Sequence, residues 1–193
     1  MDDETGSVTR TFLFSDVEGS TALIRQLRDA YTAVMGEHER LLREAWAQAG
    51  GRELDADGDS FFVCFRRPRQ AVEAAVAAQH ALAAHEWPEG VDLRVRIGIH
   101  TGEASPAGDQ YVGLAVHRAA RICDAGHGGQ ILLSGAVRES VADAGPAGVS
   151  FKDLGLHQFH GLPAPEALFQ VESADLQSKF PPPRALASTG EVP

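Results

Sequence analysis

TFLFSDVEGST, residues 11–21, is the stretch that decides the fold and the chemistry of this chain. Its first residues are mostly apolar and predict a buried strand that delivers Asp16 at an exposed C-terminal end. Gly19 lets the backbone approach a ligand closely, and the N–H groups of Ser20 and Thr21 begin a helix. Such a helix N-terminus attracts phosphate, and a carboxylate beside it can hold the divalent metal that accompanies a nucleotide. A plainer interpretation, with Ser20 as an N-cap and Asp16 as a turn residue, fits this segment at least as well.

A second acidic segment follows in GGRELDADGDSFFVCF, residues 50–65. Arg52–Leu54 and Ser60–Phe65 resemble strands, and the DADGD between them predicts a hairpin because glycine accepts a positive φ. A plain β-turn also explains this composition. However, three carboxylates in five residues repel one another unless a cation lies among them or water solvates them well. An acidic hairpin together with a strand-end aspartate and a phosphate-type turn indicates a two-metal nucleotide site.

Four motifs in this order resemble the catalytic domain of the class III nucleotidyl (adenylate/guanylate) cyclases, with this chain as a divergent bacterial member. The motifs are FSDVEGST, the acidic hairpin, RVRIGIHTGE and YVGLAVHRAARI, and the similarity runs from about Thr9 to about Val171. The resemblance implies a head-to-tail homodimer with active sites at the interface and a nucleoside triphosphate, ATP or GTP, as substrate. It also implies two divalent metal ions, Mg²⁺ or Mn²⁺, attack of the ribose 3′-oxygen on the α-phosphate, and release of pyrophosphate.

The resemblance assigns the two metal-binding aspartates to Asp16 and Asp59, both of which are intact. The N–H groups of Gly19, Ser20 and Thr21 would hold the terminal phosphates. This part of the family pattern is therefore complete.

Three of the four remaining family positions depart from the pattern. The purine-binding lysine falls on Asp55, and its partner aspartate falls on Gln110. The transition-state asparagine falls on His117, whereas the arginine one helical turn later is kept as Arg121. By spacing alone His117 and Arg121 would be a solvated basic stripe; the family motif makes them catalytic candidates.

Three functions follow from this mixed pattern. The first is a slow or atypical nucleotidyl cyclase in signal transduction, and the second is a degenerate cyclase-homology domain that binds nucleotide or a partner without turnover. Intact metal aspartates favour the enzyme, and three departures among six family positions favour the degenerate domain. A phosphodiesterase-like metal hydrolase is the weakest choice because clustered His and Asp ligands are missing from the sequence.

The composition is that of a globular domain. The chain has 193 residues, of which 44% are hydrophobic and 23% charged, enough for a sizeable core. The formal charge is 17 − 27 = −10, which argues against a nucleic-acid partner. No apolar run approaches the ~18 residues of a membrane span, and no signal-peptide pattern opens the chain. With two cysteines expected as free thiols, we expect a cytoplasmic protein without a membrane partner.

Hydrophobic periodicity predicts an α+β fold: a ferredoxin-like βαββαβ core sheet with helices covering it, plus an additional αβ unit. The expected helices are Ser20–Ala49, Pro68–Ala84, Tyr111–Ala125 and Ala136–Ala142. The expected strands are Val8–Ser15, Arg52–Leu54, Ser60–Phe65, Val91–His100, Gln130–Ser134, Phe151–His157 and Ala167–Val171. In Val91–His100 the alternation predicts one buried face, which leaves Arg94 and Arg96 towards solvent or a dimer partner, with solvent preferred.

The predicted domain spans residues 8–172. Residues 1–7 are expected to be a flexible N-terminus, and residues 173–193, with three consecutive prolines at 181–183, a linker or disordered tail. A tail of this kind is similar to the junction after cyclase-like domains in large bacterial regulators, where an effector domain follows.

Overall fold

The protein is described by a computed structural model that covers residues 6–143 and 145–184. Its strands form one mixed sheet with the order β2-β3-β1-β4-β6-β8-β7, and a short strand β5 pairs with β4 outside that path. The strands are β1 (Val8–Val17), β2 (Arg52–Asp57), β3 (Ser60–Phe65), β4 (Val95–Ala107), β5 (Gln110–Val112), β6 (Ile131–Ser134), β7 (Val149–His157) and β8 (Glu166–Ser173). All pairs are antiparallel except β4 with β6.

The first half of the chain confirms the predicted ferredoxin-like core. Read from β4, the first four strands lie in the order β4-β1-β3-β2, with helices between β1 and β2 and between β3 and β4. The helical segments are α1 (Ser20–Leu27), a 3-10 turn (Arg28–Ala30), α2 (Tyr31–Gln48), α3 (Pro68–Ala84), α4 (Leu114–Ala125) and α5 (Gly135–Ser140). The predicted pair of closing strands is confirmed as β7 and β8.

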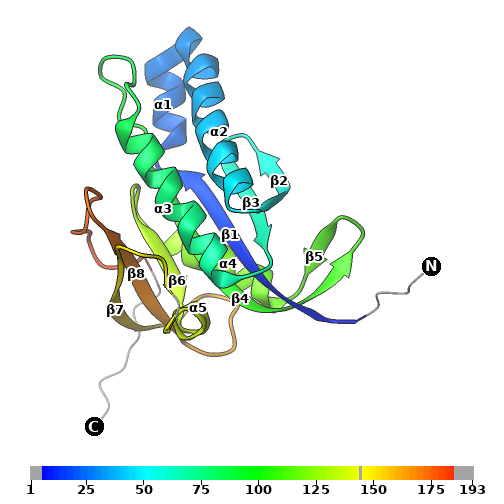
Figure 1. Ribbon diagram of the computed structural model, residues 1–193. Coiled ribbons are helices and arrows are strands. Elements are labelled where there is room, and N and C mark those ends of the chain that lie inside the picture. Colours follow the sequence, from blue (N-terminus) through cyan, green and yellow to red (C-terminus); the bar gives the residue numbers. More distant parts are fainter. Residues whose placement is uncertain (1–5, 144, 185–193) are drawn as a thin grey trace.

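The sheet separates two apolar layers of unequal size. On one face α2 and α3 lie side by side (Figure 1) and share a large core with the sheet, in which Trp46, Leu42 and Ile99 are fully or almost fully buried. On the other face α4 covers a smaller cluster that includes Phe12 and Phe62. On this second face the rings of Phe14 on β1 and Phe62 on β3 stack, with 4.4 Å between their centroids. Both faces of the central strands therefore carry apolar side chains.

Three predicted elements are wrong in extent. The single helix expected at Ser20–Ala49 is divided because Arg28 adopts φ 47°, a left-handed value that an α-helix does not contain. The helix expected from Tyr111 begins only at Leu114, because Gln110–Val112 pairs with β4 as a hairpin strand. At the junction Gly113 has φ 140°, a value that favours glycine.

The strand expected at Val91–His100 begins four residues later and is buried on both faces. A Cβ at Gly98 would lie 2.1 Å from the Cys123 backbone nitrogen, so only glycine lets α4 pack this closely on β4. Gly98, on the face of the strand that was expected to be polar, is therefore a contact with α4. This close packing also brings the last turn of α4 to the end of β1.

The predicted tail is described only as far as residue 184. The Arg184 N–H donates to the Ala125 carbonyl oxygen at 2.8 Å, and its guanidinium pairs with Glu18. The His127 ring contacts the Pro182 carbonyl oxygen at 3.0 Å. Residues 174–184 thus lie against the domain, while residues 1–5 and 185–193 of the predicted flexible ends lie outside the described residues. The domain limits at 8 and 172 stay a prediction.

Candidate nucleotide and metal site

Asp16 lies at the C-terminal end of β1, as its sequence motif predicts. Its Oδ2 atom accepts hydrogen bonds from Arg96 Nε at 2.8 Å and from Arg96 Nη2 at 2.5 Å. Antiparallel pairing places these residues directly opposite each other on β1 and β4. The prediction that Arg96 faces solvent is wrong, because α4 covers the second face of β4 and the Arg96 side chain is held by Asp16. The alternative of a partner-facing residue stays a prediction.

Asp59 follows Gly58 in the two-residue turn between Asp57 and Ser60, which confirms the predicted hairpin. The β1–β3 register pairs Ser15 with Phe61, so the turn lies beside the end of β1. The Oδ2 atom of Asp59 is buried and has no hydrogen-bond partner among the described residues. Such an atom is costly unless a cation or donor reaches it.

The electrostatic environment of Asp16 is consistent with the position of Asp59 that the strand register gives. Burial raises the pKa of Asp16, the hydrogen bond and charge of Arg96 oppose that shift, and the negative charges of Asp59 and Asp124 add to it. Arg96 thus acts as the internal counter-ion of a carboxylate cluster. The structure brings together both predicted metal residues, and it adds Arg96 and Asp124.

The protein supplies only some of the ligands that a divalent cation needs. Across residues 6–143 and 145–184, no group of three or more His, Cys, Asp or Glu side chains is arranged to hold a metal ion. Asp16 and the unpartnered oxygen of Asp59 supply hard carboxylate ligands. Mg²⁺ is commonly bound by one or two carboxylates together with water and substrate phosphates, so two aspartates are sufficient.

The turn after Asp16 has the geometry expected for an anion site. Gly19 is the N-cap of α1 with φ 71°, and no side chain caps the helix. The alternative in which Ser20 is the N-cap is therefore wrong. Ser20 is partly buried and Thr21 is exposed in the first turn of α1, where an α-helix leaves its N–H groups without intrahelical partners.

A cavity lies between the end of β1 that carries Asp16 and α4. Its walls come from the ends of β1, β3 and β4 and from the last turn of α4: Phe14, Ser15, Asp16, Ser60, Arg96, Ala120, Cys123 and Asp124. The Arg96 Nη1 atom donates to the Asp124 carbonyl oxygen at 3.2 Å. The sequence gives no signal for Asp124, because an aspartate near a helix C-terminus is ordinary in a solvated helix.

His117 and Arg121 lie on the exposed side of α4. Arg121 Nη1 is 3.4 Å from Asp124 Oδ2, and both side chains are about half exposed. Neither His117 nor Arg121 lines the cavity at Asp16. Within one chain the structure thus does not bring them to the aspartate pair; they stay candidates for a contact with a second chain.

Asp55 and Gln110 lie close together at the outer end of the same sheet face. Gln110 Nε2 donates to the Leu54 carbonyl oxygen at 2.6 Å, which ties β5 to β2. Asp55 follows a bulge in β2, and its Oδ1 accepts from the Ala56 N–H at 3.0 Å. Both side chains are exposed. The structure therefore brings together the two segments that carry this predicted pair, and neither residue lines the cavity at Asp16.

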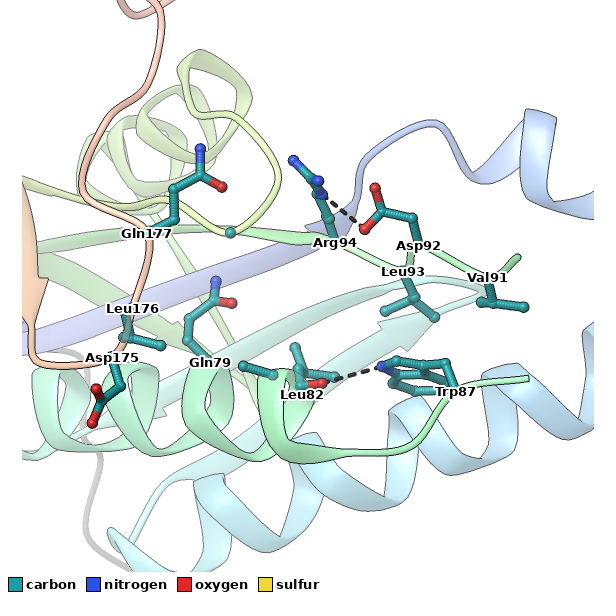
Figure 2. A pocket seen from close by; sticks show the side chains of 12 residues that line it. Gln79, Leu82, Trp87, Val91, Asp92, Leu93, Arg94, Asp175, Leu176 and Gln177 are labelled. Carbon is teal, nitrogen blue, oxygen red and sulfur yellow. Dashed lines mark hydrogen bonds and ion pairs between the residues drawn. The ribbon is translucent and has the colours of Figure 1, made fainter. Parts of the chain in front are cut away.

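A separate cavity lies between the end of α3, the segment before β4 and residues 175–177 (Figure 2). In it Trp87 Nε1 donates to the Leu82 carbonyl oxygen at 3.1 Å, and Arg94 pairs with Asp92 at 2.9 Å. None of the predicted site residues lines it. Arg94 is half exposed, as expected, so the two arginines of RVRIG have different environments.

The sheet order and the strand-end carboxylates define an α+β nucleotide cyclase-like domain, and comparison with known proteins agrees. The family model for the adenylate and guanylate cyclase catalytic domain matches residues 3–169. The chain belongs to this family. A Mycobacterium tuberculosis protein described as uncharacterized is 36% identical over 96% of the chain. A receptor-type adenylate cyclase of Trypanosoma congolense is 30% identical over 84% of it.

Solved structures share the fold. An adenylate cyclase of Trypanosoma brucei in its monomeric state has a TM-score of 0.83 at 24% identity, covering 91% of this chain and 92% of that one. An adenylate/guanylate cyclase/hydrolase from Silicibacter pomeroyi has a TM-score of 0.76 at 26% identity, covering 88% and 99%. This chain spans 62% of the mycobacterial relative and 28% of the Trypanosoma congolense relative. In the described ranges, no helix is long and apolar enough to cross a membrane.

Proposed function

We propose that this domain converts a nucleoside triphosphate to a 3′,5′-cyclic nucleotide and pyrophosphate at a site shared by two copies of the chain. The observation that carries the proposal is the position of the Asp59 turn beside the end of β1 that carries Asp16, with the Asp59 Oδ2 buried and without a partner among the described residues. Two carboxylates of this kind need cationic charge between them. Two divalent ions, Mg²⁺ or Mn²⁺, would lower the pKa of the ribose 3′-hydroxyl and clamp the triphosphate.

The protein groups around these carboxylates have complementary roles. In the absence of a cation, Arg96 neutralises Asp16. Once a cation neutralises Asp16, the Arg96 guanidinium becomes available to a phosphate oxygen, which it can contact through two N–H groups. The N–H groups of Gly19, Ser20 and Thr21 hold the terminal phosphates at the start of α1. These contacts orient the triphosphate for in-line attack.

The second copy supplies the groups that the first copy lacks. His117 and Arg121 are exposed on α4 and do not line the cavity at Asp16 of their own chain, so a head-to-tail homodimer can use them in the site of the other copy. Arg121 then offsets charge that develops on the phosphates. Asp55 and Gln110, also exposed, contact the base. The two buried free cysteines, Cys64 and Cys123, support a cytoplasmic location, and the longer relatives support an effector domain beyond the cyclase domain.

The test is an assay of purified protein with Mn²⁺ and each nucleoside triphosphate in turn, with cyclic nucleotide and pyrophosphate measured together. We expect equal amounts of both products from at least one triphosphate. The matched control is Asp57→Asn, which removes an exposed carboxylate from the same hairpin and should retain activity. Binding of the triphosphate without either product would contradict turnover.

A regulatory domain without turnover is the second candidate, and one observation favours it. Gln110 is already engaged by the Leu54 carbonyl oxygen at 2.6 Å, so its amide N–H is less available to a base. Together with the replacements at Asp55 and His117, this leaves the base and ribose contacts weaker than in the family pattern. In that case metal-dependent nucleotide binding persists, and no cyclic product forms.

A further inference from the structure

A basic cavity lies at the opposite end of β1 from Asp16. It has a volume of about 650 Å³ and opens between the start of β1, the β2–β3 edge and the β4–β5 hairpin, which extends from the body beside the N-terminal end of β1 (Figure 1). Its walls are formed by Val8, Arg10, Gly50, Arg52, Cys64, Phe65, Arg66, Gln70, Pro106, Gly108 and Tyr111. This volume is within the range of small-molecule sites.

The charge of this cavity is opposite to that of the protein. Arg10, Arg52 and Arg66 line it and no acidic residue does, although the chain carries a formal charge of −10. Within residues 6–143 and 145–184, none of these three arginines forms an ion pair with a carboxylate. Three guanidinium groups around one cavity repel one another, and a bound anion would offset that repulsion.

Two of the arginines, Arg10 and Arg52, line the cavity together with Cys64. Arg52 pairs with Cys64 across β2 and β3, and its guanidinium lies 5.6 Å from the centroid of the Tyr111 ring. The Cys64 thiol is buried, and burial raises its pKa, while the positive charges of Arg10 and Arg52 counteract that shift. Arg10 and Arg52 therefore both place positive charge near Cys64, and the Arg52 guanidinium also lies over an aromatic ring.

Gln70 gives an independent indication of a ligand. Its Nε2 donates to the Ala49 carbonyl oxygen at 3.0 Å, whereas its Oε1 is buried without a hydrogen-bond partner among the described residues. A buried acceptor of this kind requires a donor. Guanidinium groups bind phosphate, and an amide oxygen accepts from a hydroxyl group. One ligand that satisfies both is a phosphate ester with free hydroxyl groups.

We propose that this cavity binds a sugar phosphate, in a site separate from the nucleotide site of the same chain. Arg10 and Asp16 lie on the same face of β1, six residues apart, which corresponds to ~20 Å along an extended strand. The phosphate lies among Arg10, Arg52 and Arg66, and a hydroxyl group donates to Gln70. Tyr111 lines the cavity and directly follows Gln110 in the sequence, so the bound ligand lies beside the proposed base contact.

The first measurement is calorimetric titration of the metal-free protein in EDTA with ribose 5-phosphate, inorganic phosphate and ribose. We expect ribose 5-phosphate to bind more tightly than inorganic phosphate, and ribose to give no binding. Arg10→Gln and Arg66→Gln should each weaken ribose 5-phosphate binding about tenfold or more, because each removes a charge-assisted contact. The matched control is Arg67→Gln, at an exposed arginine that adjoins Arg66 but does not line the cavity.

The site of binding and the role of the hydroxyl group need separate variants. Asp59→Asn should leave the affinity unchanged, because the aspartates lie at the opposite end of β1 from the cavity. Gln70→Leu should weaken ribose 5-phosphate while leaving inorganic phosphate unaffected. Absence of binding at millimolar ribose 5-phosphate, or equal weakening by Arg67→Gln and Arg66→Gln, would overturn the proposal. Equal affinity for inorganic phosphate and ribose 5-phosphate would overturn the assignment of a sugar.

Discussion

Asp16 at the end of β1 is half-buried and held by two hydrogen bonds from Arg96, whereas Asp55 on β2 is exposed and accepts a hydrogen bond from the neighbouring backbone N–H of Ala56. The first belongs to the aspartate end of the candidate site, where the family residues are intact and packed between β1, β3, β4 and α4. The second belongs to the base end, where the family residues are replaced and face solvent. The residues proposed to bind metal are thus fixed by packing within one chain, whereas the residues proposed to bind the base lie on its surface.

The largest expected effect is at the aspartate end. Asp16→Ala and Asp59→Ala should each lower metal-dependent turnover by about a thousandfold or more, since charge stabilisation by metal ions is worth several kcal/mol. Circular dichroism should show that both variants remain folded. Retention of Mn²⁺-dependent triphosphate binding by both variants in calorimetry would remove the metal assignment.

Mixing variants tests whether the two ends act in trans. Asp16→Ala subunits and Arg121→Ala subunits should be nearly inactive alone, and an equal mixture should recover about a quarter of wild-type activity, because half of randomly assorted dimers contain one intact site. The measurement is cyclic nucleotide formation after mixing at high protein concentration. Mixing Asp16→Ala with Asp59→Ala provides the control, because both lesions fall in the same half-site. No gain above that control, with a monomeric protein, would contradict the shared site.

Burial at the aspartate end also predicts a pH dependence of stability. His38 on α2 is fully buried beside Phe61, and desolvation lowers its pKa from 6.5 to about 4. Between these pH values the unfolded chain binds a proton that the folded chain does not, so stability is lost as the pH falls. The loss from this residue is roughly 3 kcal/mol.

His38→Leu should therefore reduce the slope of unfolding free energy against pH between 6.5 and 4, measured by urea denaturation. His117→Leu, at an exposed histidine of the base end, is the matched comparison and should leave the slope unchanged. Equal slopes in wild type and His38→Leu would show that His38 is protonated without cost in the folded protein.

The smallest expected effect concerns the base. An ionised Asp55 can accept from the N1–H and N2–H groups of guanine, whereas the N1 atom of adenine is itself an acceptor. A mismatched, desolvated polar group costs ~1–3 kcal/mol, or roughly ten- to hundredfold in affinity. We expect GTP to bind more tightly than ATP, and Asp55→Lys to reduce that preference. Titrations of both nucleotides measure it, with Asp57→Lys as control; a clear preference for ATP would reject this role for Asp55.

The sequence predicted the βαββαβ order correctly because hydrophobic period and turn residues are local properties. The Asp-Gly turn at residues 57–58 and the helix Pro68–Ala84 agree with the structure. The division of the first helix at Arg28 and the late start of β4 were not predictable in the same way. They depend on how segments far apart in the chain pack together, and this packing cannot be inferred from the local hydrophobic periodicity.

For the site, the sequence by itself determined which residues are chemically able to bind metal and phosphate: Asp16, Gly19 and Asp59. Only the tertiary structure decided what surrounds them. Arg96 occupies a polar position of a strand in which apolar and polar residues alternate. That alternation predicts a solvent-exposed side chain only if nothing covers the second face of the sheet. Because Gly98 allows α4 to pack on that face, the side chain of Arg96 lies between β1 and α4 and neutralises Asp16. The environment of a side chain depends on which elements pack around it, whereas the chemical groups that it offers depend on the residue alone.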